Sequence, residues 1–190
     1  MNDRSVILMD NKKTKKDLIM SVALEEFAEF GYHATSVHTI AKKANVSKGL
    51  LYNYFESKED LLKEIIFAGL KILSDIFDPD KDGVLTEDEF EFLIEKVFNV
   101  LKENLGIWRL YFSLLMKSGV QEIIKEPMYQ YMEPFLQILN NYYKRQGKKN
   151  PEIWSVFFGS VLDGISVNFI SEPELYPLEE IKKLIINVLK

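Results

Sequence analysis

The chain has 190 residues, of which 47% are hydrophobic, so it is long and apolar enough for two small folded domains and is not a disordered protein. It contains no cysteine, which excludes disulfide bonds and thiolate metal sites. The net charge of -5 lies in residues 61–190, whereas residues 1–60 carry nine basic and nine acidic side chains, so contact with a polyanion would depend on how individual lysines are placed.

The chain begins with a segment that is predicted to be a flexible arm over residues 1–11. Its apolar run, Val6–Met9, is too short for the core of a signal peptide or for a membrane span, so we expect a cytoplasmic protein with no membrane partner. A first helix is predicted over Lys13–Phe30, because apolar residues recur on one face, and Gly31 is expected to end it.

Two short helices joined by a tight turn are predicted between residues 36 and 55. Ser36 and Ser47 are good N-caps for the two helices, and Asn45 between them tolerates the left-handed conformation of a sharp turn. The apolar Leu51 and Phe55 are expected to anchor the second helix from beneath. This arrangement is a helix-turn-helix, which makes double-stranded DNA the expected partner.

A longer motif surrounds these two helices. Its residues are Phe27, Gly31, Tyr32, Thr35, Ser36, Ile40, Ala41, Ala44, Val46, Ser47, Lys48, Gly49, Leu51, Tyr52, Tyr54, Phe55, Ser57, Lys58, Glu59, Leu61 and Leu62. On this motif, residues 14–62 resemble the TetR (tetracycline repressor) family of bacterial transcriptional regulators. The chain departs from the usual pattern at Asn45, where relatives carry Gly, and at Leu50, where they carry a smaller residue.

The resemblance implies a division of the chain into a helix-turn-helix DNA-binding domain, a three-helix bundle over residues 1–60, and a ligand-binding and dimerisation domain over residues 61–190. It implies a repressor that binds a palindromic operator as a homodimer and is released by a small molecule. An enzyme is not expected, because the only histidines, His33 and His38, lie in the DNA-binding part and no nucleophile is paired with a base.

The candidate DNA contacts lie on and around the two short helices. They are Ser36, His38, Thr39, Ser47, Lys48, Gly49, Leu50, Tyr52, Asn53, Tyr54 and Lys58. We expect Lys48 and the backbone at Gly49 to approach base edges, and Leu50 to contact a thymine methyl group. Tyr52, Tyr54 and Lys58 are expected to hold phosphates. Further lysines that could meet phosphates are Lys12, Lys13, Lys15, Lys16, Lys42 and Lys43.

The rest of the chain predicts further helices and no strand, so the fold class is all-α with about nine helices. Ser57 is expected to cap a helix over Lys58–Phe77. Later helical patterns cover Glu87–Asn104, Ile107–Lys117, Gln121–Gln146, Pro151–Ser171 and Leu178–Lys190, with breaks near Gly106, Gly119, residues 147–150 and residues 172–177.

Aromatic and methionine side chains are concentrated in the second domain. Candidates for a ligand pocket are Trp108, Tyr111, Phe112, Met116, Tyr131, Phe135, Trp154 and Phe158. Pro127 and Pro134 interrupt the facing helix, and kinks of this kind open space between helices. A hydrophobic or aromatic inducer is therefore expected, although ordinary core packing accounts for most such residues.

The last two predicted helices offer more apolar surface than one bundle can bury. Residues 151–171 place Phe157, Val161, Gly164 and Val167 on one face, where small residues permit a close helix crossing. The last helix is also rich in Ile, Leu and Val. Both features favour a homodimer through these helices, as the family resemblance implies.

One segment departs from the family pattern. Residues 78–89 match the twelve-residue EF-hand calcium loop, with Gly83 at its sixth position. The ligand positions would be Asp78, Asp80, Asp82, the carbonyl of Val84, Thr86 and Glu89. Thr86 and Glu89 would equally form a capping box for the next helix, without any ion. The sequence leaves open a regulator that requires no cofactor and a calcium-responsive regulator or interaction module controlled by this loop.

Overall fold

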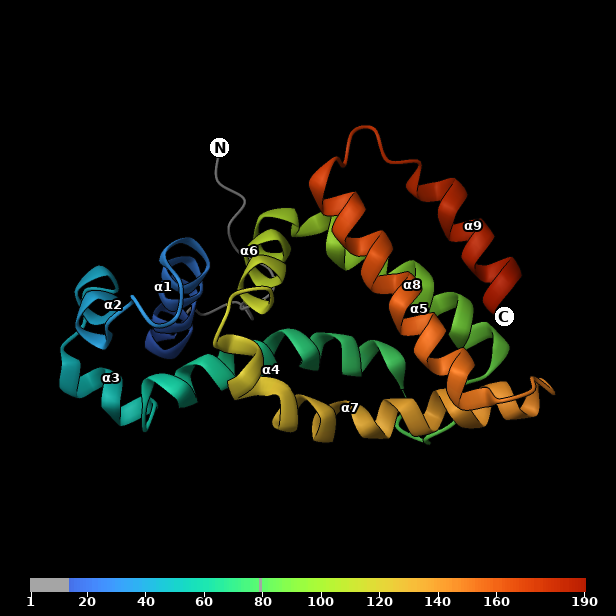
Figure 1. The fold of residues 1–190 in the computed structure, drawn as a ribbon, viewed down its shortest axis with the longest axis horizontal. Helices are drawn as coiled ribbons and strands as arrows, with labels where there is room; N and C mark the ends of the chain where they lie inside the picture. Colours follow the sequence, from blue (N-terminus) through green and yellow to red (C-terminus); the bar gives the residue numbers. More distant parts are fainter. Residues whose placement is uncertain (1–13, 79) are drawn as a thin grey trace. The chain divides into compact units, whose positions relative to one another are not determined.

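The computed structural model describes residues 14–78 and 80–190, with the side chains of residues 72–75 excepted. Its helices, in chain order, are α1 (Lys15–Phe30), α2 (Val37–Lys43), α3 (Lys48–Tyr54), α4 (Lys58–Phe77), α5 (Glu87–Glu103), α6 (Leu105–Leu115), α7 (Val120–Arg145), α8 (Pro151–Ser171) and α9 (Leu178–Leu189) (Figure 1). No strand occurs in this part of the chain, which confirms the all-α fold class.

The helices form two compact units. The first unit extends to Lys71 and also includes Gly106–Met128, and the second comprises Ile72–Leu105 and Tyr129–Lys190. Helices α4 and α7 each contribute residues to both units. The division between a DNA-binding domain and a ligand-binding domain at residue 60 stays a prediction.

In the first unit, α1, α2 and α3 pack around a small apolar core. Ile19, Phe27, Ile40 and Leu51 have no exposed surface, and Phe55 is 1% exposed. Burial of such side chains stabilises the unit by about 1.5–3 kcal/mol each.

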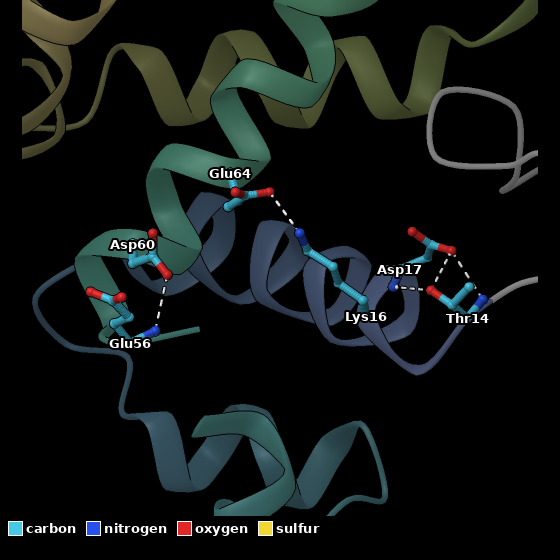
Figure 2. Close-up of polar contacts among 6 residues, drawn as sticks. All are labelled: Thr14, Lys16, Asp17, Glu56, Asp60 and Glu64. Atoms are coloured by element: carbon cyan, nitrogen blue, oxygen red, sulfur yellow. Dashed lines mark hydrogen bonds and ion pairs between the residues drawn. The ribbon is translucent and has the colours of Figure 1, made fainter. Parts of the chain in front are cut away.

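Polar contacts fix the ends of the elements in this unit (Figure 2). Thr14 and Asp17 form a capping box at the start of α1, and Lys16 of α1 pairs with Glu64 of α4 at 2.9 Å. Asp60 accepts a hydrogen bond from the backbone N–H of Glu56, at 2.9 Å, and so holds the turn before α4. The Lys16–Glu64 pair and the Glu56–Asp60 hydrogen bond therefore hold the start of α4 against α1, α2 and α3.

The second unit is built on α5, which contacts both α8 and α9 (Figure 1). Its core is aromatic: Phe90 stacks on Tyr142 with ring centroids 5.0 Å apart, and Phe158 lies 5.4 Å from Phe90. Lys182 of α9 is 5% exposed and pairs with Glu95 of α5 at 2.8 Å. These contacts join α9 to the bundle through one of its faces.

The predicted helix limits agree with the structure within two residues. The predicted break near Gly106 is confirmed and lies at Asn104, where the chain leaves the helical conformation with φ -135° and ψ 33°, while Gly106 itself lies inside α6. The Asn104 side chain donates to the carbonyl of Val100 at 3.1 Å, a local bond that a helix-period pattern does not reveal. Helix α7 runs through both Pro127 and Pro134.

Candidate nucleic-acid interface

The helix-turn-helix is formed by α2, residues 44–47 and α3. Ser36 caps α2 by accepting from the N–H of Thr39 at 3.0 Å, and Ser47 caps α3 by accepting from the N–H of Leu50 at 3.0 Å. Asn45 has φ 52°, as its place in the tight turn predicts. Both caps and the left-handed turn residue are confirmed.

Helix α3 buries one face and exposes the other. Leu51 is fully buried and Phe55, just after the helix, is 1% exposed, whereas Tyr52 is 44% and Tyr54 is 41% exposed. The predicted contacts Ser36, His38, Ser47, Lys48, Gly49 and Asn53 are also exposed, and Thr39 and Leu50 are partly exposed. The exposed side of α3 is thus a continuous run of polar and aromatic groups above an apolar anchor.

Gly49 lies on this exposed side without a packing reason within the chain. A Cβ added there would meet only the Ser47 hydroxyl, at 4.0 Å. Gly49 is in a helix, where glycine is unfavourable by roughly 0.5–1 kcal/mol relative to alanine. A missing side chain at this place leaves room for close approach by a partner.

Three lysines near the helices are engaged inside the domain. Besides Lys16, Lys43 pairs with Glu26, whose side chain is nearly buried, and its ammonium lies 5.3 Å from the Phe30 ring centroid. The hydrogen bond that the Lys43 ammonium donates to Glu26 raises the pKa of Lys43. Lys43 therefore neutralises a buried carboxylate, and its contact with phosphate stays a prediction.

Lys58 has a similar internal position. Its ammonium donates to the carbonyls of Tyr32 and Thr35, at 2.9 and 3.1 Å, and lies 4.3 Å from the centroid of the Tyr32 ring. Burial lowers the pKa of Lys58. Lys58 thus holds the connection between α1 and α2, a role that sequence spacing did not reveal. Its contact with phosphate stays a prediction.

The other described lysines of the predicted basic surface are free of such internal positions. Lys15, Lys42 and Lys48 are exposed. Lys12, Lys13 and the arm over residues 1–11 lie outside the described residues. Within the described residues the cationic part of the candidate interface therefore centres on Lys42 and Lys48, beside the exposed tyrosines.

The predicted pocket residues fall into two groups. In the first unit, Trp108, Tyr111 and Phe112 pack together, with centroid distances of 5.4 to 6.2 Å, and the Tyr111 hydroxyl donates to the Ile66 carbonyl at 3.0 Å. Met116 lies beyond the end of α6 and is 70% exposed, so it does not share the buried position of Trp108 and Tyr111, and its place in a pocket stays a prediction.

The second group lies in the other unit. Phe77 lies 5.5 Å from Phe135 and 6.2 Å from Phe158 by ring centroids, and Tyr131 lies 6.0 Å from Phe135. Trp154 packs 5.8 Å from Tyr143. The structure thus gives two aromatic clusters, one in each unit.

The acidic loop between α4 and α5 has both features that its sequence predicts. Thr86 and Glu89 form a complete capping box at the start of α5. Asp78, Asp80 and Asp82 each bring a carboxylate oxygen within 4.8 Å of the other two. The capping box is confirmed, and the metal role of these residues stays a prediction.

Comparison with known proteins identifies the helix-turn-helix. The sequence profile of the bacterial regulatory proteins, tetR family, matches residues 19–65. The uncharacterized HTH-type transcriptional regulator YhgD of Bacillus subtilis is 46% identical over 57 residues, which are 30% of each chain. The fatty acid metabolism regulator protein of Bacillus subtilis is 27% identical over 133 residues, 70% of this chain and 68% of that protein.

The likeness extends beyond the helix-turn-helix in three dimensions. A solved transcriptional regulator of the TerR/AcrR family from Aquifex aeolicus VF5 is 28% identical, has a TM-score of 0.64, and matches over 93% of this chain and 98% of its own. The sequence match to YhgD spans less than a third of that protein's length. Residues 19–65 therefore match the helix-turn-helix of the tetR family of bacterial regulatory proteins, and most of the chain shares the fold of this solved regulator.

Proposed function

We propose that the chain is a transcriptional regulator, a repressor that binds a palindromic DNA operator as a homodimer and leaves it when a hydrophobic small molecule binds. The observation that carries this proposal is the division of α3 into a buried face and an exposed face. Lys48, Tyr52 and Tyr54 are exposed while Leu51 is fully buried. A short helix held by its apolar side and presenting cationic, hydroxyl and amide groups is suited to the major groove.

Within the proposed interface the roles divide by chemistry. Lys48 and the open position at Gly49 approach base edges, and Tyr52 and Tyr54 donate to phosphates. The Lys48 ammonium lies 5.7 Å from the Tyr52 ring centroid, so the two side chains share one part of the surface. Lys58 acts mainly by positioning, since its ammonium donates to the carbonyls of Tyr32 and Thr35.

The second copy in the proposed dimer covers the exposed faces of α8 and α9. Ile153, Val156 and Val167 of α8 are 66%, 62% and 41% exposed, and Leu184 and Val188 of α9 are 57% and 47% exposed. A large unpartnered apolar surface of this kind marks an interaction site. A symmetric dimer also places two recognition helices for the two halves of a palindrome.

The same apolar surface bears on localisation. Helix α8 is long and apolar enough to cross a membrane, with a mean hydropathy of 1.5. However, Ser155 and Ser166 of α8 are buried within the unit and Phe158 packs on Phe90, so α8 is part of a folded bundle. We propose a cytoplasmic protein in which the exposed side of α8 meets protein rather than lipid.

The proposed inducer is a hydrophobic molecule with a polar group. Trp108 is 2% exposed, and its indole nitrogen is buried without a hydrogen-bond partner, so a ligand oxygen could satisfy it. The relative that regulates fatty acid metabolism makes long-chain acyl compounds the first class to test. The regulator itself requires no cofactor in this proposal.

Operator selection tests the proposal directly. The full-length protein would be used to enrich binding sites from a random duplex library, and the enriched sequence would be titrated by fluorescence anisotropy at two salt concentrations. We expect a palindromic site, binding by a dimer, and an affinity that falls steeply with salt. Absence of any enriched sequence, or equal affinity for unrelated duplexes, would overturn the proposed function.

A further inference from the structure

The loop between α4 and α5 carries carboxylates that DNA binding does not use. One oxygen of each of Asp78, Asp80 and Asp82 lies within 4.8 Å of the corresponding oxygens of the other two. At such distances like charges repel one another, and the repulsion is relieved by a cation placed between them. The capping box of α5 accounts for Thr86 and Glu89 but not for these three aspartates.

Independent evidence for a ligand comes from one oxygen of Asp78. Its Oδ1 atom exposes less than 1 Å² and has no hydrogen-bond partner, whereas its Oδ2 accepts from the N–H of Gly83 at 3.2 Å. A carboxylate oxygen removed from water without a donor is costly, and an ion is one of the few groups that satisfies it. The described chain supplies no donor to this oxygen of Asp78, a residue that is itself partly exposed, and a bound cation would satisfy it.

The sequence spacing places further oxygen donors around the three aspartates. We propose that residues 78 and 80–89 form a binding site for one Ca²⁺ ion. The expected ligands are Asp78, Asp80, Asp82, the carbonyl of Val84, Thr86 and Glu89. Gly83 takes φ 75° at the sharp bend, and Oε2 of Glu89 accepts from the N–H of Thr86, which leaves the other oxygen of that carboxylate for the ion. An all-oxygen set of this size suits Ca²⁺ better than the smaller, octahedral Mg²⁺.

Neighbouring contacts connect the loop to the rest of its unit. Leu85 is 1% exposed, and its carbonyl accepts from the Arg145 guanidinium of α7 at 2.7 Å. Glu87, the first residue of α5, pairs at 3.3 Å with Lys190, which directly follows α9. Binding of Ca²⁺ therefore fixes the start of α5 against α7 and the end of the chain, and stabilises the second unit.

Calorimetric titration of the full-length protein with CaCl₂, without DNA, tests this site independently of the proposed regulator function. We expect one ion per chain with a Kd between roughly 10 µM and 1 mM. Calcium at tenfold the Kd should raise the Tm by roughly 3–6 °C, and MgCl₂ should raise it less.

Two charge-matched variants separate coordination from screening. Asp80→Asn keeps an oxygen that can accept the hydrogen bond from the N–H of Asp82, now 3.3 Å from Oδ1, but loses the charged ligand. It should weaken Ca²⁺ binding at least tenfold. Asp88→Asn removes the same charge from the exposed first turn of α5, at a position that supplies no ligand, and should leave the Kd within about twofold.

Each result decides for or against the site. Equal effects of Ca²⁺ and Mg²⁺, or equal effects of the two variants, would show screening of an acidic surface and overturn the proposal. No heat of binding and no change in Tm up to several millimolar CaCl₂ would do so as well. Circular dichroism of Asp80→Asn, compared with the unsubstituted protein, establishes that a lost signal does not come from unfolding.

Discussion

His33, in the connection between α1 and α2, lies directly against Gly119 in the turn between α6 and α7. A Cβ added at Gly119 would come within 2.2 Å of the His33 imidazole Nε2. Gly119 also has φ 80°, a conformation that side chains with a Cβ rarely adopt. The α1–α2 connection and the α6–α7 turn thus meet at a contact that requires glycine for two separate reasons.

We predict that Gly119→Ala lowers the free energy of unfolding by about 1–3 kcal/mol from backbone strain, and by a further amount from the collision with His33. Gly147→Ala is the matched control, because Gly147 has φ 70° but no atom within 4 Å of an added Cβ. Urea denaturation of both variants measures the difference. His33→Ala in the Gly119→Ala background should recover the collision part only. Equal losses for Gly119→Ala and Gly147→Ala would refute the proposed contact.

Much of the fold follows from local signals. Helices α4 and α8 have the bounds that the sequence predicts, because Ser57 before α4 and Pro151 in the first turn of α8 mark their starts. The helix-turn-helix follows likewise from Ser36 and Ser47. These signals act over a few residues, so a single sequence is enough to show them.

The roles of individual lysines do not follow from local signals. Lys43 meets Glu26, 17 residues away, and Lys58 meets Tyr32, 26 residues away. Both lysines are cationic and lie near the helix-turn-helix in the sequence, as phosphate contacts would. Only the packing of α1 against later helices reveals their internal partners. The division of the aromatic residues into two clusters has the same origin, since helical periodicity gives a buried face but not the neighbour that covers it.

Two substitutions on the exposed side of α3 should have different effects on operator binding. Tyr54→Phe removes one hydroxyl and should weaken binding to all duplexes by roughly 5-fold, because a phosphate contact carries no sequence information. Lys48→Ala should weaken operator binding by about 1–3 kcal/mol and also reduce the preference over a scrambled duplex. Anisotropy titrations with both duplexes measure the two effects. An unchanged preference in Lys48→Ala would remove Lys48 from base recognition.

A charge on the apolar face of α8 should dissociate the proposed dimer. Val167→Glu places a carboxylate where the second copy is expected, and burying it there without a partner is costly. Phe92→Glu on α5 is the control, because Phe92 is 43% exposed and Val167 is 41% exposed. Light scattering at micromolar concentration should give a monomer of 22.2 kDa for Val167→Glu and a dimer for the control. A monomeric unsubstituted protein would contradict the proposed assembly.

The buried hydroxyl of Tyr143 should be dispensable for stability. Tyr143 has no exposed surface, and its hydroxyl has no hydrogen-bond partner, so Tyr143→Phe removes a desolvated group and should raise the free energy of unfolding by about 1 kcal/mol. Tyr111→Phe is the opposite control, because it loses the bond to the Ile66 carbonyl and should be destabilised by a similar amount. Loss of stability in Tyr143→Phe would indicate a partner such as a buried water.

The Tyr143→Phe substitution should also change how the free energy of unfolding depends on pH. Burial raises the pKa of Tyr143 above its ordinary value of 10.0, and burial together with Glu87 raises the pKa of Tyr142 to about 12. A raised phenol pKa means that the folded state favours the neutral form, so this contribution to stability is fully present below pH 10 and is lost as the pH rises through the folded pKa. Between pH 10 and 12, the free energy of unfolding of Tyr143→Phe should therefore fall less steeply than that of the unsubstituted protein. Denaturation curves at several alkaline pH values measure the two slopes, and parallel slopes would show that Tyr143 ionises in the folded state as readily as an exposed phenol.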